Sequence, residues 1–288
     1  MTQAAVAECY YVNGRWVRPE QAVVPVEDRG FQLGDGLYEV IRIYGGQPFA
    51  LDRHLARLER CAAAIELALP AGRDELAALA AEAARRRGLL EGQVYMQVTR
   101  GVAARVHHFP ADAQPSLIVY AMPGRIPDPA LYERGATAIV VPDERWLRCD
   151  IKSINLLPNA LAKEKARRAG VLEALLEREG KGITEGSSSN VFIVQGGRLI
   201  TAPAGPYILR GVTRDLVIEL AHAAGVPVEE RFFSRAELLA ADEAFLTSTM
   251  MEVMPLVQVD GHTIGTGVPG PLTRRLHAAL RQLTPSVS

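Results

Sequence analysis

Residues 182–194 read Gly-Ile-Thr-Glu-Gly-Ser-Ser-Ser-Asn-Val-Phe-Ile-Val, a polar stretch that runs directly into a short apolar segment. The apolar part, 191–194, predicts a buried strand. In the polar part, glycines and serines would let backbone and hydroxyl groups approach a ligand closely. Glu185 is the only charge between Thr184 and Asn190. The stretch is therefore either a ligand-contacting segment or an ordinary connecting loop.

Outward from this stretch, tight turns separate short apolar segments along the whole chain. The pairs Asn13-Gly14, Gly45-Gly46, Gly196-Gly197 and Asp260-Gly261 are typical of hairpin turns, whose central residues need positive φ angles. Short strands with tight connections favour an α/β (α+β) fold with mixed or largely antiparallel sheets over a regular doubly wound sheet. Strands are expected at 10–12, 15–17, 40–44, 47–50, 94–99, 117–121, 136–141, 191–194, 198–201, 244–247 and 256–259.

Helical periodicity appears in both halves of the chain. An apolar stripe with steps of four and three residues predicts a helix that starts near Asp52, and a second helix runs from Asp74 to Gly88. In the second half, 159–169 has the polar face of a surface helix, and 208–215 opens a helix that ends at Gly225. The first stripe consists of Leu51, Leu55, Leu58, Ala62 and Ile65.

The length of 288 residues suggests two domains. Residues 122–129 read Met-Pro-Gly-Arg-Ile-Pro-Asp-Pro, and their prolines and glycine interrupt regular structure. We therefore expect an N-terminal α/β domain at 1–122, a linker at 123–129 and a C-terminal α/β domain at 130–288.

Composition excludes several classes of protein. A net charge of −1 gives no sign of nucleic-acid or membrane binding. The three cysteines are widely spaced, without a metal-ligand pattern or an expected disulfide. Met1–Ala7 lacks the pattern of a signal peptide, and no apolar run is long enough to span a membrane. We expect a soluble cytoplasmic protein without a metal site.

Any lysine chemistry has four candidates among 28 arginines: Lys152, Lys163, Lys165 and Lys181. The last three occupy a polar helix face and a turn, which are ordinary solvent positions. Lys152 lies in the apolar segment 147–157, which has strand character. Burial lowers the pKa of a lysine and makes it a nucleophile toward aldehydes. Lys152 is therefore either catalytic or paired with a carboxylate such as Asp150.

Two further segments could bind anions. The backbone amides after Gly211 point out of the start of a helix, which suits a phosphate, although Thr213 could equally be a simple N-cap. In the loop 99–109, Arg105 and His107 would lie on one side if the chain is extended. An arginine beside a histidine can bind a carboxylate or can be plain surface charge.

Several strings, taken in order, resemble fold-type IV pyridoxal-phosphate enzymes, and among them the bacterial D-amino acid aminotransferases. The resemblance extends from about Tyr10 to Leu283. It implies a two-domain fold with the cofactor at the domain interface, a homodimer, and no nucleic-acid or membrane partner. The strings that carry it are 27–40, 97–101, 145–153, 184–192 and 211–214.

The resemblance implies a role for each matching residue. Lys152 corresponds to the lysine that binds pyridoxal 5′-phosphate covalently and moves the substrate proton, and Glu185 to the partner of the pyridine nitrogen. The implied phosphate contacts are Arg57, Val212, Thr213 and Thr249, with Leu209 packed under the ring. Tyr38, Arg105 and His107 correspond to the group that binds the substrate α-carboxylate, the latter two from the neighbouring subunit.

The implied reaction is amino transfer between a D-amino acid, of the D-alanine or D-glutamate class, and a 2-oxo acid. Three alternatives share the fold: a transaminase of branched-chain L-amino acids or (R)-amines, an aminodeoxychorismate lyase, and a non-catalytic binding protein. The pair Arg105 and His107 argues against the first alternative. Residues 250–254, Met-Met-Glu-Val-Met, are more apolar than the resemblance predicts, and we expect them to shape the pocket for the substrate side chain.

Overall fold

A computed structural model describes residues 9–124 and 126–285, and the chain divides into two units. Of the described residues, the first unit contains 9–124, 151–155 and 285, and the second contains 126–150 and 156–284. Met1–Ala7, on which the signal-peptide expectation rests, lie outside the described residues. The linker expected at 123–129 includes residue 125, also outside them, and stays a prediction. The return of 151–155 to the first unit was not predicted.

The first unit contains an antiparallel sheet with strand order β2-β1-β6-β5-β3-β4. The hairpins at Asn13-Gly14 and Gly45-Gly46 form as predicted. The strands are β1 (Tyr10–Val12), β2 (Arg15–Val17), β3 (Gly36–Tyr44), β4 (Gln47–Pro48), β5 (Gly92–Thr99) and β6 (Ser116–Met122).

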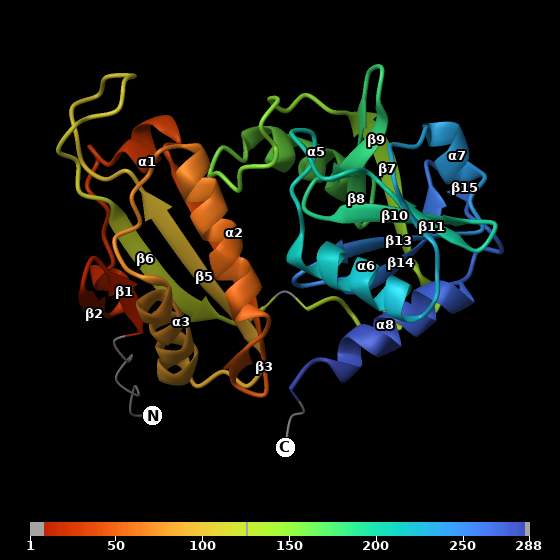
Figure 1. The fold of residues 1–288 in the computed structure, drawn as a ribbon, viewed down its shortest axis with the longest axis horizontal. Coiled ribbons are helices and arrows are strands. Elements are labelled where there is room, and N and C mark those ends of the chain that lie inside the picture. Colours follow the sequence, from red (N-terminus) through yellow and green to blue (C-terminus); the bar gives the residue numbers. More distant parts are fainter. Residues whose placement is uncertain (1–8, 125, 286–288) are drawn as a thin grey trace. The chain divides into compact units, whose positions relative to one another are not determined.

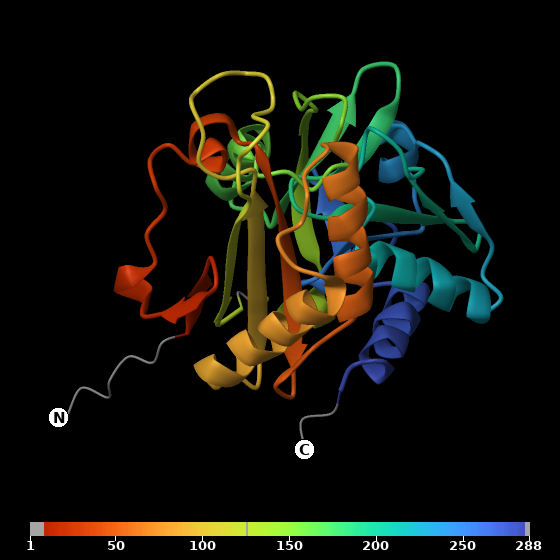
Figure 2. The same ribbon diagram turned by 60° about the vertical axis from the view of Figure 1, so that its left-hand side comes forward.

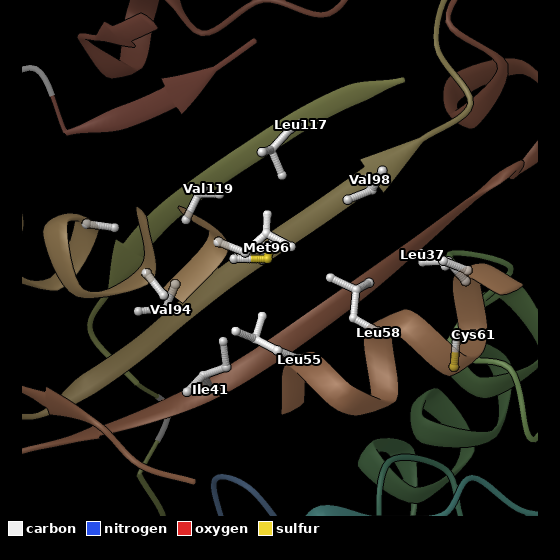
Figure 3. Close-up of a cluster of buried hydrophobic side chains, with 14 of the residues drawn as sticks. Leu37, Ile41, Leu55, Leu58, Cys61, Val94, Met96, Val98, Leu117 and Val119 are labelled. Carbon is white, nitrogen blue, oxygen red and sulfur yellow. The ribbon is translucent and has the colours of Figure 1, made fainter. Parts of the chain in front are cut away.

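Two helices cover one face of this sheet, α2 (Leu51–Ala64) and α3 (Arg73–Arg87), as Figures 1 and 2 show. Their apolar side chains pack against β3, β5 and β6 (Figure 3). Burying a side chain such as Leu55 contributes about 1.5–3 kcal/mol, so this face anchors the unit. The short helix α1 (Arg29–Leu33) and the 3-10 turn Pro19–Gln21 were not predicted from the sequence.

Alternation along β3 assigns its side chains to two faces. Leu37, Ile41 and Ile43 join the core under the helices. Tyr38 points to the opposite face, where its ring centroid lies 5.9 Å from that of Tyr95 on β5. A row of tyrosines therefore crosses the sheet on the face away from the helices, and it continues through Tyr120 to Tyr10.

The second unit contains a mixed sheet with order β12-β11-β10-β13-β14-β7-β8-β9, and β15 pairs with β14. The pairs β11–β12, β14–β7 and β7–β8 are parallel and the others antiparallel, which confirms the predicted mixture. The strands are β7 (Ala136–Pro142), β8 (Glu173–Arg178), β9 (Gly182–Gly186), β10 (Asn190–Gln195), β11 (Arg198–Thr201), β12 (Val228–Glu230), β13 (Glu243–Ser248), β14 (Glu252–Val259) and β15 (His262–Thr263).

Helices of the second unit lie against this sheet (Figure 1). The helix α6 starts at Val212, after the segment 208–211 that was expected to open it. Among the described residues, no helix is long and apolar enough to cross a membrane, and no cluster of metal-ligating side chains occurs. The helices are α4 (Ala130–Arg134), α5 (Leu157–Arg168), α6 (Val212–Ala223), α7 (Arg235–Leu239) and α8 (Pro271–Gln282).

Candidate active site

Lys152 lies in the segment 151–155, which runs beside the start of β3 in the first unit. The backbone amide of Tyr38 donates to the carbonyl of Lys152 at 3.1 Å, and the amide of Lys152 approaches the Cys61 Sγ atom at 3.4 Å. Ser153 forms an isolated bridge with Leu37. These contacts fix the backbone on both sides of the lysine, while its half-buried side chain extends over the Tyr38 ring, 4.0 Å from Nζ to the ring centroid.

Two expectations about this lysine are wrong. The segment 147–157 is not a strand, because it contains turns and bends before the single bridge at Ser153. The expected partner Asp150 instead accepts hydrogen bonds from the Arg148 guanidinium at 3.1 Å. Among the described residues, no carboxylate forms an ion pair with Lys152, so the ion-pair alternative is not supported.

Arg57, on α2, forms a buried ion pair beneath the same sheet. Its Nε and Nη2 atoms donate to the two carboxylate oxygens of Glu39 at 2.8 and 2.7 Å. His54 Nδ1 lies 2.7 Å from Glu39 Oε2. Burial alone would raise the pKa of Glu39, but Arg57 and His54 hold it well below its usual value. Burial lowers the pKa of His54, and because a carboxylate only accepts, the His54 Nδ1 atom is the donor in this contact.

Arg105 and His107 lie in the loop between β5 and β6, with bends at 105 and 107 rather than an extended backbone. The extended backbone on which alternation would align them is therefore absent from this loop. Both side chains are exposed, and neither has a hydrogen-bond or ion-pair partner within 9–124 and 126–285. The pair is available for a ligand.

Glu185 lies on β9 in the second unit, where part of the expected polar loop is in fact a strand. Its buried carboxylate accepts hydrogen bonds from three directions. Arg145 Nη1 donates to Oε1, Asn190 Nδ2 donates to Oε2 at 3.0 Å, and the Leu209 amide lies 3.0–3.1 Å from both oxygens. A carboxylate has about four acceptor positions, and these contacts, two at each oxygen, hold the Glu185 carboxylate in place.

A single arginine joins Glu185 to a second carboxylate. Arg145 also binds Asp143 through two nitrogens, at 2.9 and 3.0 Å. Burial would raise the pKa of Asp143, but Arg145 and Arg178 hold it below its usual value. Burial raises the pKa of Glu185 to about 7, against the opposing effect of Arg145. The environment thus separates one firmly ionised carboxylate from one that titrates near neutral pH.

The helix α6 starts three residues after Leu209, whose amide donates to Glu185. Its N-cap residue Gly211 supplies no side-chain cap, and the first helical residues Val212 and Thr213 are buried. A Cβ atom on Gly211 would lie 2.2 Å from Asn190 Oδ1, so only glycine permits this close approach. Asn190 Nδ2 also donates to the Leu209 carbonyl at 2.9 Å, which ties the segment before α6 to β10. Thr249 follows the end of β13.

Comparison with known proteins identifies the family. A family model described as amino-transferase class IV matches residues 36–259. The chain belongs to the class IV aminotransferases. A D-alanine aminotransferase from Bacillus licheniformis is 45% identical over 269 residues, which cover 93% of this chain and 94% of the relative. A D-alanine aminotransferase from Staphylococcus aureus is 40% identical over 282 residues, which cover 98% of this chain and 99% of the relative.

Solved structures of class IV aminotransferases share the fold. A branched-chain amino acid aminotransferase from Escherichia coli gives a TM-score of 0.90 at 30% identity and covers 96% of this chain and 94% of its own. A second branched-chain amino acid aminotransferase, solved with pyridoxamine 5′-phosphate, gives a TM-score of 0.88 at 29% identity. The match covers 96% of this chain and 93% of that chain. The predicted fold class is confirmed.

Sequence reasoning missed several partners of the residues it selected in this aminotransferase. Arg145 is 40 residues from Glu185, and no spacing rule connects them. Glu39 follows Tyr38 directly but faces the opposite side of β3, where it binds Arg57. The available signal was the position of Glu39 in step with Leu37, Ile41 and Ile43, because a charge on the core face of a strand needs a buried partner.

Proposed function

We propose that this class IV aminotransferase transfers the amino group between a D-amino acid and a 2-oxo acid, with pyridoxal 5′-phosphate as the cofactor. The observation that carries the proposal is Lys152: its amine has no carboxylate partner among the described residues, while its backbone is held at three points. The D-alanine aminotransferases at 40–45% identity over nearly the whole chain support the same substrate class.

The described residues fit the cofactor. An amine without a salt bridge suits covalent attachment to an aldehyde. Burial raises the pKa of Glu185 to about 7, which suits sharing a proton with a pyridine nitrogen. The uncapped start of α6 suits a doubly charged phosphate. When bound, pyridoxal phosphate supplies a ring that accepts electrons from the substrate α-carbon.

Lys152 and Glu185 would control the protons of the reaction. Once the incoming amino acid has displaced it, the Nζ atom of Lys152 would move the proton from the substrate α-carbon to the C4′ atom of the cofactor. Glu185 would keep a proton between its carboxylate and the pyridine nitrogen, and the donors Arg145, Asn190 and Leu209 would keep that carboxylate in place.

The phosphate would be held by Arg57 and by the start of α6. Glu39 binds one edge of the Arg57 guanidinium and fixes its plane, and a guanidinium has five N–H donors in all. The amides of Val212 and Thr213 would donate to the phosphate, Thr249 would add a hydroxyl, and Leu209 would pack under the ring.

Tyr38, Arg105 and His107 would bind the substrate α-carboxylate. Charge-assisted hydrogen bonds to a carboxylate contribute about 1.5–3 kcal/mol each, so this group would fix the orientation of the amino acid. With the carboxylate held at this end, only the D-enantiomer would turn its α-hydrogen toward Lys152.

We further infer a homodimer in the cytoplasm. Exposed apolar side chains gather on 23–31 and 102–109, including Phe31 at 75% and Phe109 at 48% exposure. A monomer rarely exposes so many together, and a second copy would cover them. The three cysteines are buried and none forms a disulfide, which is typical of a reducing compartment.

One panel of donors tests the proposal. Cofactor-loaded enzyme is mixed with D-alanine, L-alanine, L-leucine or an (R)-amine, each with 2-oxoglutarate, and the products are resolved by chirality. We expect D-glutamate from D-alanine and at least 100-fold slower transfer from the other donors. Faster transfer from L-leucine would favour the branched-chain enzymes, which are similar in structure at about 30% identity. Pyruvate release from aminodeoxychorismate would indicate a lyase.

A further inference from the structure

Arg29 is buried in the first unit at a position that the proposed reaction does not use. Only 2% of the residue is exposed. Its Nε atom donates to Asp35 Oδ2 at 2.8 Å, and its Nη1 atom donates to the carbonyl of Val106 at 2.6 Å. A longer contact of 3.5 Å joins Nη2 to the carbonyl of His107. One guanidinium therefore connects the start of α1 to the middle of the loop between β5 and β6.

A second buried arginine supports the same loop. Arg100, 6% exposed, donates from Nε to the same Asp35 oxygen at 2.9 Å. Its other nitrogens donate to the carbonyls of Ile65 and Glu66 at 2.7 and 2.9 Å, and its guanidinium carbon lies 3.6 Å from the centroid of the Phe109 ring. Asp35 thus links two arginines that hold the loop at 106 and at 109.

The base of the loop is also closed. The Arg29 amide donates to the Gly101 carbonyl at 2.9 Å, and the Arg100 amide donates to the Asp35 carbonyl at 3.0 Å. Gly101 has φ +91°, and a Cβ atom there would lie 1.8 Å from the carbonyl oxygen of Gln114. Only glycine at position 101 therefore lets the backbone approach the Gln114 carbonyl this closely at the base of the loop.

The outcome is a loop with a fixed backbone and available side chains. Arg105 and His107 stand on either side of Val106, whose carbonyl Arg29 binds, and their own side chains have no polar partner among the described residues. Long flexible side chains bind a carboxylate poorly unless their backbone is held in place.

We propose that Arg29 is a positioning residue for substrate binding, acting through the backbone of 106–107 to place Arg105 and His107. This inference rests on the proposed role of those two residues in binding the α-carboxylate. Lysine cannot replace Arg29, because three acceptors around one planar group need the fork of a guanidinium.

The test compares Arg29→Lys with Arg105→Ala and with Arg42→Lys in the cofactor-loaded enzyme. Arg42 is the matched control, since it is 3% exposed and paired with Glu91 but does not touch the loop. KM and kcat for D-alanine are measured together with inhibition by propionate, which has the carboxylate of alanine without the amine. Thermal unfolding reports stability.

We expect Arg29→Lys to raise KM and the propionate inhibition constant roughly tenfold, as slight misplacement of binding groups does, with kcat within about twofold and the cofactor absorbance retained. In the Arg105→Ala background, Arg29→Lys should add little. Arg42→Lys should change stability without changing KM. An Arg29→Lys enzyme whose KM and inhibition match those of Arg42→Lys would overturn the positioning role.

The two proposals fail in different ways. If Arg105→Ala leaves KM unchanged, the loop does not bind the carboxylate, and the role of Arg29 falls with it. If Arg105→Ala raises KM but Arg29→Lys does not, only the positioning role is wrong. Should Arg29→Lys not fold, Asp35→Asn takes its place, because it removes the carboxylate to which Arg29 donates and should raise KM in the same direction. An unchanged KM in Asp35→Asn would then reject the proposal.

Discussion

The Nζ atom of Lys152 lies 4.0 Å from the centroid of the Tyr38 ring, and the Tyr38 amide donates to the carbonyl of the same lysine. The ring face attracts the ammonium by about 0.5–2 kcal/mol, without the lasting partnership of a carboxylate. The lysine is thus oriented but remains available for reaction. Tyr38 would thus have two roles: its ring orients Lys152, and its hydroxyl group, as proposed, binds the substrate carboxylate.

Substitutions of Tyr38 should separate these two contributions. Tyr38→Phe keeps the ring and loses one hydrogen bond, so KM for D-alanine should rise by roughly 3- to 30-fold with little change in kcat. Tyr38→Leu also loses the ring over which Lys152 lies, so kcat should fall as well. Steady-state kinetics measure both effects. Equal kcat in the two variants would show that the ring does not orient the lysine.

The pH dependence of unfolding should reveal Glu185 in the protein without cofactor. Its pKa is about 7 when folded and near 4.5 when unfolded, so the folded state binds this proton more tightly. The associated stability is present below pH 4.5 and is lost as pH rises through 7, by on the order of 1–3 kcal/mol. Urea unfolding at several pH values should show this loss in the wild type and not in Glu185→Gln. An identical pH profile in both would contradict the raised pKa.

Asp143 and Glu39 act in the opposite direction and in a different pH range. Both have a lowered pKa in the folded state, so their stability is lost as pH falls below about 4. For the urea unfolding of Glu185→Gln described above, Glu144→Gln is the matched control, because Glu144 is an exposed glutamate.

Arg57→Ala should weaken both the fold and cofactor binding. Removal of Arg57 leaves the buried Glu39 carboxylate with His54 but without its guanidinium partner, which costs about 3–5 kcal/mol. The double variant Glu39→Gln/Arg57→Ala should recover part of that free energy of unfolding but not the affinity for pyridoxal phosphate. Thermal unfolding with and without the cofactor separates the two losses. A double variant that binds the cofactor normally would remove Arg57 from the phosphate site.

Gly211→Ala should disturb the Glu185 cluster from a distance. The added methyl would lie 2.2 Å from Asn190 Oδ1 and push the amide away from the carboxylate. Cofactor affinity should fall about tenfold, equivalent to about 1.4 kcal/mol. Gly205→Ala is the control, because no atom lies within 4 Å of its Cβ position. Titration of the cofactor-free proteins measures the effect, and equal affinities would refute it.

Sequence alone predicted the local elements well. The hairpins, the α2 stripe and the mixed sheets depend on neighbouring residues, such as Asn13-Gly14 and the alternation through Val94 and Met96. Segments with few apolar residues were harder. The polar 182–190 stretch was expected to be a loop, but 182–186 form β9. Only 187–189 connect β9 to β10, and there Ser187 and Ser189 bind the buried carboxylate of Glu173.

Long-range pairs were beyond the reach of spacing arguments. The partners Glu185–Arg145, Arg57–Glu39 and Arg29–Val106 are brought together only by strand order and by the path of loops. The resemblance selected the residues expected to touch cofactor and substrate. The resemblance did not identify the buried charged residues that hold these site residues in place, because those contacts form only when the sheet is assembled.

Chemical trapping of the cofactor tests the central claim most directly. The cofactor-loaded protein is reduced with borohydride, digested, and its peptides are weighed. The phosphopyridoxyl mass should be found on the peptide that contains Lys152 and should disappear in Lys152→Ala, while Lys163→Ala keeps it. A modified Lys163, Lys165 or Lys181 in its place, or retained modification in Lys152→Ala, would show that Lys152 does not bind the cofactor.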